Sequence, residues 1–216
     1  MLAARKESIA KLPTPLSHVP AQPASSLEAR GKGVLVVMND EINAAREVTK
    51  TNTLRVETFR TPDLGLLGYV DEDRVAFYRS PTRRHTVNSE FDVTRIAKVP
   101  SVEIVYSYVQ PSAAPIQALT SSGTQGIVLA GMGSGSISEA HRTALQAVLS
   151  MPPASRPVVV RASRVGSGRV ISRDEFDRLG LVAGDNLNPQ KARILLMLAL
   201  TKTTDVNEIR RMFAEY

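Results

Sequence analysis

Three segments of the sequence contain residues that could take part in chemistry. Lys50 supplies an amine, a group that can act as a general acid or base, within a polar Val-Thr-Lys-Thr-Asn-Thr run. Residues 131–136 (Gly-Met-Gly-Ser-Gly-Ser) could direct successive backbone N–H groups at an anion or a carboxylate. Glu175 supplies a carboxylate, a group that forms strong charge-assisted hydrogen bonds when partly desolvated.

Each of these segments also has a plainer structural explanation. A lysine in a polar run is usually a solvated loop cation, since lysines are found mostly at protein surfaces. The glycines at positions 131, 133 and 135 do not fit Gly-x-Gly-x-x-Gly, and no Lys-Ser or Lys-Thr follows them. A glycine-rich turn between a strand and a helix explains this loop more simply. Glu175 could be an exposed loop acid, so from the residues alone the alternatives stay open.

The sequence contains no pattern that is typical of a metal or cofactor site. His18, His85 and His141 show no ligand spacing, and the chain has no cysteine. A disulfide framework, a thiol nucleophile and a Cys-ligated zinc site are therefore excluded. Nothing brings these histidines to a particular serine, so a Ser-His-Asp triad is not predicted either. We expect neither a metal nor a cofactor.

The charge of the chain does not indicate a nucleic-acid partner. The formal net charge is +6, but lysine and arginine are interleaved with acids. The densest cluster, residues 79–85, holds three arginines around a proline. A solvated connector explains this cluster more simply than a nucleic-acid surface does. No run approaches eighteen apolar residues, and the start of the chain lacks the apolar region of a secretory signal. We expect a soluble protein, cytoplasmic as written, with no membrane partner.

The second half of the sequence alternates between strand and helix patterns. Residues 102–108, 126–130 and 157–161 are rich in β-branched residues and predict strands. Residues 114–121 and 138–149 predict the intervening helices. This alternation indicates the α/β class, with a small parallel sheet and flanking helices.

Two further helices at the end of the chain have clear start signals. Asn188 is a predicted cap with Pro189 at the first helical position, and Asp205 is a predicted cap for a helix through Phe213. The apolar positions of the first of these helices recur with helical spacing: Ala192, Leu195, Leu196 and Ala199.

The first half of the chain contains fewer clear elements. Residues 34–38 (Val-Leu-Val-Val-Met) predict a strand buried on both faces of a parallel sheet, and Asn39-Asp40 after it favours a turn. Residues 69–70 and 75–78 predict a short hairpin. These are too few strands for a domain with its own core.

Two segments together resemble the bacterial L-asparaginase and glutaminase-asparaginase family. They are residues 34–53, which contain Val-Met-Asn-Asp and Val-Thr-Lys-Thr-Asn-Thr, and residues 188–203, which begin Asn-Pro-Gln-Lys-Ala-Arg. The Gly-x-Gly-x-Gly-Ser run lies between them, and the resemblance extends over about 190 residues to Tyr216.

The resemblance implies a domain organisation. It implies a complete asparaginase C-terminal α/β domain at residues 101–216, a remnant of the N-terminal domain at 27–80, and a linker at 81–100. Residues 1–26 lie outside the resemblance. Four prolines within eleven residues indicate that this segment is disordered.

The resemblance also implies roles for three residues. Lys50 corresponds to the lysine of a catalytic Thr-Lys-Asp triad. Ser136 falls where members have a Ser or Asn that contacts the substrate across a subunit interface. A serine at this position resembles the glutaminase-asparaginase branch of the family. Glu175, with Asp174 as the alternative alignment, falls where a glutamate holds the α-amino group of the substrate across the same interface. Ser134 departs from the family, which usually has Asn there.

Members of the family hydrolyse L-asparagine, and often L-glutamine, to the acid and ammonia through an acyl-enzyme. Their two catalytic threonines lie in Thr-Gly-Gly-Thr and Gly-Thr-Asp-Thr motifs before the 34–38 strand, and neither motif occurs in these 216 residues. Because such groups act as a unit, we expect a truncated amidohydrolase with negligible activity alone. Whether the chain is itself an enzyme stays open.

The alternative is a non-catalytic C-terminal interaction module that docks on an intact asparaginase subunit. The resemblance implies a homo-oligomer or an association with a full-length member, besides the small-molecule substrates. Full-length members can be periplasmic.

Overall fold

The structure, a computed structural model, describes residues 26–216 as two compact units. The first unit ends at Ile96, and the second runs from Ala97 to Tyr216. The proline-rich segment expected to be disordered lies, apart from Ser26, outside the described residues. The domain boundaries expected from the sequence stay a prediction, because compactness is not a test of independent folding.

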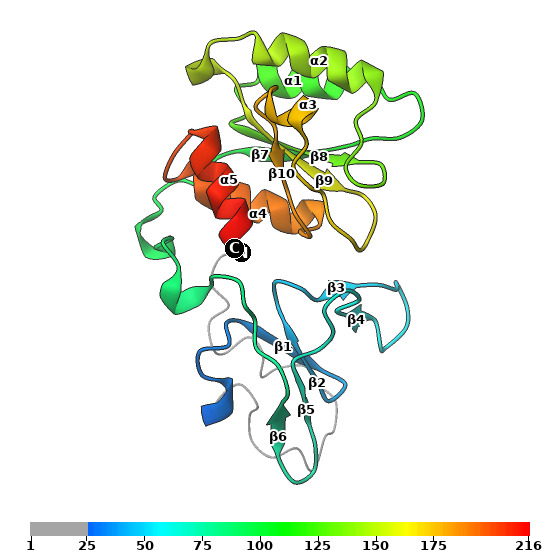
Figure 1. The fold of residues 1–216 in the computed structure, drawn as a ribbon, viewed down its shortest axis with the longest axis vertical. Coiled ribbons are helices and arrows are strands. Elements are labelled where there is room, and N and C mark those ends of the chain that lie inside the picture. Colours follow the sequence, from blue (N-terminus) through cyan, green and yellow to red (C-terminus); the bar gives the residue numbers. More distant parts are fainter. Residues whose placement is uncertain (1–25) are drawn as a thin grey trace. The chain divides into compact units, whose positions relative to one another are not determined.

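The first unit is built on a four-stranded antiparallel sheet in the order β1–β2–β5–β6 (Figure 1). Asn39 and Asp40 join the first two strands with φ of 51° and 60°, the left-handed pair that a type I′ hairpin turn requires. The predicted turn at these residues and the predicted hairpin near residues 69–78 are therefore confirmed. The strands are β1 (Leu35–Met38), β2 (Glu41–Ala44), β5 (Gly68–Val70) and β6 (Val75–Phe77).

The expected position of the strand at residues 34–38, buried inside a parallel sheet, is wrong for the described chain. β1 runs antiparallel to β2, with Val36 opposite Asn43, and its four residues are only half-buried. β1 lies at the edge of the sheet, so within residues 26–216 β2 is its one strand partner. A short apolar run indicates a strand, but its neighbours in the sheet are set by distant parts of the chain.

β2 supplies much of the core of the first unit. Ile42 and Leu67 are fully buried, and Asn43 accepts a hydrogen bond of 2.8 Å from the buried hydroxyl of Thr61. A second, two-stranded sheet pairs β3 (Thr49–Lys50) with β4 (Phe59–Arg60). β2, β3 and β4 were not predicted from the sequence, because strands of two to four residues with polar members have no clear period.

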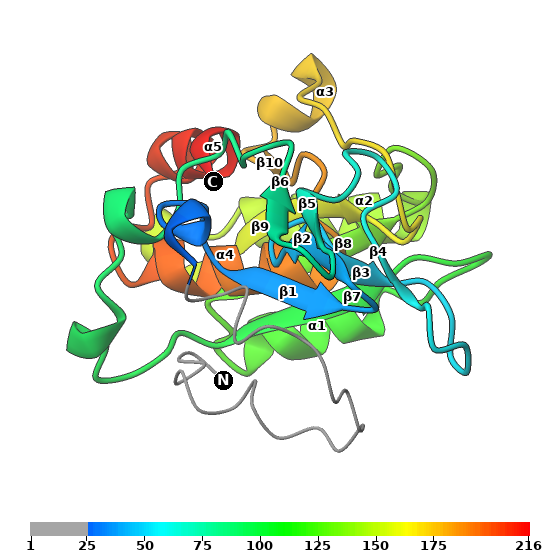
Figure 2. The same ribbon diagram turned by 90° about the horizontal axis from the view of Figure 1, so that it is seen from below.

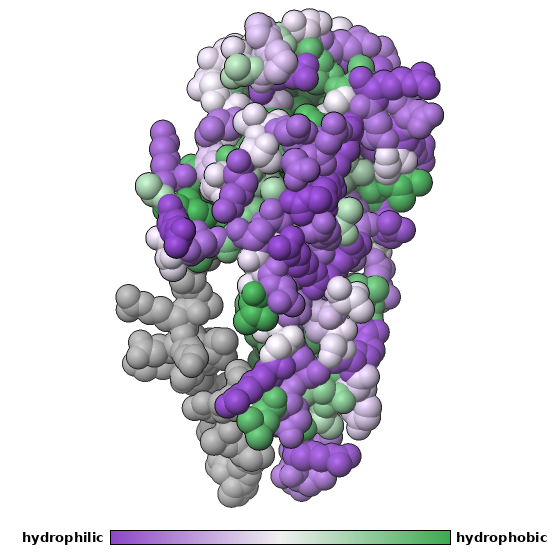
Figure 3. Space-filling view, turned by 60° about the vertical axis from the view of Figure 1, so that its left-hand side comes forward, coloured by the Kyte–Doolittle hydropathy of each residue, from purple (hydrophilic) through white to green (hydrophobic). Residues whose placement is uncertain are grey.

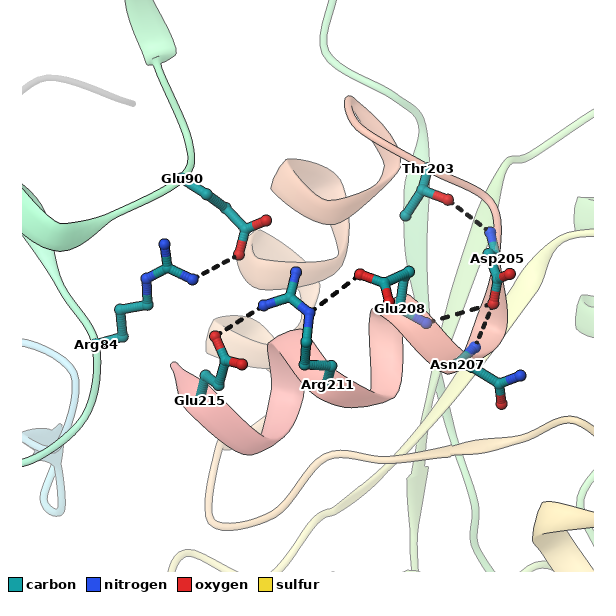
Figure 4. Close-up of polar contacts among 8 residues, drawn as sticks. All are labelled: Arg84, Glu90, Thr203, Asp205, Asn207, Glu208, Arg211 and Glu215. Atoms are coloured by element: carbon teal, nitrogen blue, oxygen red, sulfur yellow. Dashed lines mark hydrogen bonds and ion pairs between the residues drawn. The ribbon is translucent and has the colours of Figure 1, made fainter.

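The arginine cluster at residues 79–85 is held by local contacts. Arg79 donates to the Gly65 carbonyl at 3.1 Å, and Arg84 forms an ion pair with Glu90 at 3.1 Å (Figure 4). Short 3₁₀ turns occur at Leu27–Ala29, Thr86–Asn88 and Val93–Arg95.

The second unit has three layers, with a parallel sheet between two pairs of helices (Figure 1; Figure 2). The sheet has the order β10–β9–β8–β7, and α1 and α2 cover one face while α4 and α5 cover the other. The α/β class with a small parallel sheet and flanking helices is therefore confirmed. The strands are β7 (Val102–Tyr106), β8 (Gly126–Gly131), β9 (Val158–Ser163) and β10 (Val182–Ala183). The helices are α1 (Ala114–Ser121), α2 (Glu139–Leu149), α3 (Asp174–Asp177), α4 (Pro189–Leu200) and α5 (Val206–Glu215).

β8 lies in the middle of this unit, and all six of its residues are buried. That pattern is expected of a parallel strand that helices cover on both faces. Ile127 and Leu129 pack with residues of α1 and α2, among them Ile116 and Leu145. Gly126, at the start of the strand, leaves room for the side chain of Leu196 in α4.

The caps predicted for the last two helices are confirmed. The Asn188 side chain accepts a hydrogen bond of 2.9 Å from the Lys191 N–H, and Pro189 is the first residue of α4. Asp205 accepts from the N–H groups of Asn207 and Glu208 at the start of α5 (Figure 4). These side chains satisfy N–H groups that have no partner within the helix.

One face of the described chain can be judged from its hydropathy. The face shown in Figure 3 is largely hydrophilic, with hydrophobic residues in small separate groups. Within residues 26–216 no helix is long and apolar enough to cross a membrane. The same part of the chain gathers no group of three or more His, Asp or Glu residues that could hold a metal ion.

His141 in α2 should make stability depend on pH. The ring is 1% exposed, its Nε2 lies 3.2 Å from the Ser112 carbonyl, and among the described residues its Nδ1 has no partner. Burial lowers the pKa of His141, and the hydrogen bond to Ser112 opposes this with a smaller effect. Protonation would place a second N–H where nothing described accepts it, so the neutral ring is the favoured form.

We therefore expect stability to fall as the pH drops. The pKa of His141 in the folded state is below its unfolded value of about 6.5. The contribution of His141 to the free energy of unfolding is therefore complete above that pH and declines below it. Urea denaturation at about pH 7.5 and about pH 5.5 measures the change, with His141→Gln as the control. A difference between the two pH values that is equal in both proteins would contradict the assignment to His141.

Candidate functional site

Lys50 ends β3 in the first unit, opposite Phe59 of β4, and is exposed. The segment after it is held by its own polar side chains. Thr51 donates to the Thr58 carbonyl at 2.9 Å, and the Asn52 N–H donates to the Thr58 hydroxyl at 2.9 Å. The Thr58 hydroxyl in turn donates to the Asn52 carbonyl. Strand pairing and this network fix the backbone at Lys50 and leave the amine accessible.

The glycine-rich loop, residues 131–136, follows β8 in the second unit and folds back on itself. Met132 and Ser136 exchange two backbone hydrogen bonds of 3.1 Å and 2.8 Å. Gly135 has φ of 81°, a conformation that L side chains rarely adopt. A Cβ atom at Gly131 would lie 2.6 Å from the Ser136 carbonyl oxygen, so only glycine fits this close approach. Ser136 is exposed at the end of this narrow turn.

Side chains from neighbouring segments hold the tip of the glycine-rich loop. The Ser163 hydroxyl, at the end of β9, donates to the Gly133 carbonyl. Arg173 donates to the Ser134 hydroxyl at 3.3 Å. Ser134 is the position at which the chain departs from the family resemblance. In this chain its hydroxyl accepts the hydrogen bond from Arg173.

Arg161, near the end of β9, lies beneath the loop and is the largest fully buried side chain of the described residues. It donates to the Gly135 carbonyl at 3.2 Å and to the Ile171 carbonyl at 2.7 Å. Its guanidinium lies 3.9 Å from the centroid of the Phe176 ring. Burial lowers the pKa of Arg161 to about 10, and the nearby carboxylate of Asp177 acts in the opposite direction.

The sequence analysis treated Arg161 only as the end of a strand. A usable signal was present, because an arginine that directly follows three valines in a buried strand must find partners inside the protein. Which partners it finds could not be read from the sequence.

Glu175 lies in α3, next to Phe176, and its side chain is 53% exposed. Arg142 of α2 lies 3.5 Å from one of its oxygens and 5.4 Å from the centroid of the Phe176 ring. Asp174, the alternative position, is 92% exposed and lies 3.8 Å from Arg178. Glu175 is therefore the more enclosed of the two acids.

The glycine-rich loop and the segment that carries Glu175 are joined in the second unit. Gly135 packs so closely on Val170 that a Cβ atom there would lie 2.7 Å from it, and Arg161 connects both segments to β9. These segments follow the carboxyl ends of β8 and β9, the edge at which open α/β sheets bind ligands. Lys50 belongs to the first unit and Ser136 and Glu175 to the second.

Comparisons with known proteins agree with this architecture. The family model "Glutaminase/Asparaginase C-terminal domain" matches residues 101–213, and the model "Asparaginase, N-terminal" matches residues 21–83. A crystal structure titled as a probable cytoplasmic L-asparaginase from Campylobacter jejuni is similar, with a TM-score of 0.83 and 44% identity. That similarity covers 88% of this chain and 61% of the other.

Curated relatives show the same similarity over 89% of this chain. A probable periplasmic L-asparaginase of Haemophilus influenzae is 43% identical over 195 residues, which are 55% of its length. L-asparaginase 2 of Escherichia coli is 42% identical, with 55% of its length covered, and a glutaminase-asparaginase of Pseudomonas fluorescens is 43% identical, with 53% covered. The chain thus spans about half the length of these relatives, and it belongs to the glutaminase/asparaginase family.

Proposed function

We propose that this chain contributes to an amidohydrolase that releases ammonia from the carboxamide of L-asparagine or L-glutamine. The names of the similar proteins support this reaction and these substrates. The observation that carries the proposal is the arrangement in the second unit, where one buried arginine holds both the glycine-rich loop and the segment with Glu175. A carboxylate that is held in place can accept charge-assisted hydrogen bonds from the α-ammonium group of an amino-acid substrate.

Each candidate residue has a chemical role in this proposal. Lys50 takes the role that the family resemblance implies, in which the neutral form of the amine accepts the proton of an attacking hydroxyl; in the described chain its side chain is exposed and its backbone is held by strand pairing. Ser136 contacts the substrate with its exposed hydroxyl. Glu175 accepts hydrogen bonds from the α-ammonium group, for which Arg142 at 3.5 Å is the competing cation.

The finer part of the proposal concerns the nucleophile. The 216 residues contain neither Thr-Gly-Gly-Thr nor Gly-Thr-Asp-Thr, the motifs that carry the attacking threonines in the family. Removal of one member of a catalytic constellation costs several orders of magnitude in rate. We propose that these 216 residues alone do not turn over, and that the threonines must come from another polypeptide segment.

Ammonia release tests this proposal. The purified 216-residue chain is incubated with L-asparagine and with L-glutamine, beside a Lys50→Met variant prepared identically. We expect no more ammonia from the wild type than from the variant. Turnover that disappears in Lys50→Met would overturn the proposed inactivity and show that another residue attacks. Turnover that is equal in both proteins does not depend on Lys50. A mock preparation from host cells without the chain then distinguishes a contaminating host enzyme, if it releases the same ammonia, from a reaction of the chain itself, which would also overturn the proposed inactivity.

A second candidate function is a non-catalytic module that docks on an intact asparaginase subunit. The observation that favours it is the exposure of Ser136 and Glu175, the residues that the family resemblance places at a neighbour's site. Size-exclusion chromatography with and without Escherichia coli L-asparaginase 2 tests it. A mixed oligomer supports docking, and separate elution at the sizes of the single proteins contradicts it. The same run with this chain alone tests the proposed homo-oligomer.

The cellular location also stays a proposal. Similar proteins are named as periplasmic in one case and cytoplasmic in another. We propose the cytoplasm, and fractionation of the native host with an antibody to this chain measures it directly.

A further inference from the structure

Arg161 connects parts of the second unit that are distant in the sequence. Its two terminal nitrogens donate to the carbonyls of Gly135 and Ile171, and its guanidinium covers the ring of Phe176. Gly135 belongs to the glycine-rich loop, and Phe176 is the neighbour of Glu175 in α3. A single side chain thus contacts both segments that carry the proposed substrate-binding residues.

The geometry of these contacts needs the planar fork of a guanidinium. The two terminal nitrogens donate to carbonyls on different segments while the central carbon of the guanidinium lies 3.9 Å from the centroid of the Phe176 ring. A lysine has one compact ammonium group and cannot make both carbonyl contacts and the ring contact with the same orientation. Through these contacts Arg161 supplies a hydrogen-bond donor to two backbone carbonyls, those of Gly135 and Ile171.

Stability alone is a poor reason for a buried arginine at this position. Transfer of the charge from water to the interior is costly, and the lowered pKa of Arg161 reflects that cost. Among the described residues its Nε atom has no hydrogen-bond partner. An apolar residue of similar volume often stabilises a protein as well or better than a buried ion. The arginine is better explained by what it holds in place.

We propose that Arg161 is a positioning residue, which fixes the glycine-rich loop relative to α3 so that Ser136 and Glu175 face the same amino-acid ligand. The inference rests on the proposed function for the identity of the ligand. Arg142 extends the arrangement, because it pairs with Glu175 and lies over the ring of Phe176 that Arg161 covers. Arg161 itself has no contact with the substrate in this scheme and acts only through the two segments.

The absence of cysteine from the chain permits a direct test. Ser136→Cys together with Glu175→Cys gives two unique sites for nitroxide labels, and pulsed electron paramagnetic resonance measures the distribution of distances between them. We expect one narrow distribution when Arg161 is present. In Arg161→Lys, which keeps the charge and loses the fork, we expect a clearly broader distribution with unchanged far-UV circular dichroism.

Arg156→Lys is the matched control in the same unit. Arg156 also donates to a carbonyl, that of Leu149 at 2.7 Å, but it contacts neither the glycine-rich loop nor α3. We expect the narrow distribution to persist in this variant. A broad distribution already present with Arg161, an unchanged one in Arg161→Lys, or equal broadening in Arg156→Lys would each overturn the proposal.

A second variant keeps the proposal testable should Arg161→Lys fail to fold. Phe176→Leu removes the ring beneath the guanidinium but retains an apolar side chain in the core. We expect it to broaden the distance distribution in the same way, and a narrow distribution would contradict the proposal. Because these distances are measured without substrate or turnover, they stay informative even when the ammonia assay overturns the proposed function.

Discussion

Replacement of Leu196 by alanine is expected to lower the free energy of unfolding of the second unit by about 2–5 kcal/mol, the usual cost of a leucine deleted from a packed core. Leu196 lies in α4, is 0% exposed and reaches the start of β8, where a Cβ atom at Gly126 would come within 2.8 Å of its Cδ2. The helix packs against both the sheet and α5, so it cannot easily move to fill the cavity. The expected loss therefore has two parts, because less apolar surface is buried on folding and a cavity is left in the core.

Urea denaturation followed by far-UV circular dichroism measures this loss. Every α-helix that the structure describes lies in the second unit, so the helical signal reports on that unit. Ile194→Ala is the matched control in the same helix, because Ile194 is 38% exposed and leaves a smaller cavity. We expect it to cost about 1 kcal/mol. Equal losses in the two variants would show that α4 does not pack as described.

Gly131→Ala is expected to disrupt the glycine-rich loop. The added Cβ atom would lie 2.6 Å from the Ser136 carbonyl oxygen and 2.7 Å from the Gly135 carbonyl carbon, which are backbone atoms that cannot rotate away. The two hydrogen bonds between Met132 and Ser136 must then lengthen or break. We expect a destabilisation of about 1–3 kcal/mol, the usual cost of an overpacked site.

Hydrogen exchange monitored by mass spectrometry locates the effect, and urea denaturation gives its size. Residues 131–136 should exchange faster in Gly131→Ala than in the wild type, because their backbone hydrogen bonds are lost. Gly166→Ala is the control, since a Cβ atom there meets nothing within 4 Å and the backbone does not have a positive φ. In Gly166→Ala the free energy of unfolding should be unchanged or higher by up to about 1 kcal/mol. An unchanged exchange rate in Gly131→Ala would contradict the close approach.

The elements of the second unit could be predicted because their signals are local. Asn188 and Asp205 both cap helices as expected, and the predicted helical positions Ala192, Leu195, Leu196 and Ala199 are all buried. A cap depends on two or three neighbouring residues, and an apolar period of 3.6 needs only one helix and one covered face. β8 and β9 were also clear in the sequence. A short run of β-branched and other apolar residues is typical of a parallel strand that is buried on both faces of its sheet.

The sequence analysis was less successful where an element is short or its partner is distant. It identified a strand before Asn39 but placed it in a parallel sheet, whereas β1 pairs antiparallel with β2 at a sheet edge. It contained no prediction for α3, which has only four residues. A run of four or five residues carries too little periodicity to select its neighbours.

The sequence by itself determined which residues are candidates for chemistry, and the longer helices and strands of the second unit. Lys50 and Ser136 were identified in motifs that are contiguous in the chain, and Glu175 through the family resemblance with Asp174 as the alternative; the roles of all three remain proposals. The tertiary structure decided what surrounds them: Glu175 lies beside Arg142, and Arg161 holds the loop of Ser136 and the ring of Phe176. A buried side chain takes its partners from whatever the fold brings within about 3–4 Å, and those residues have no fixed separation in the sequence.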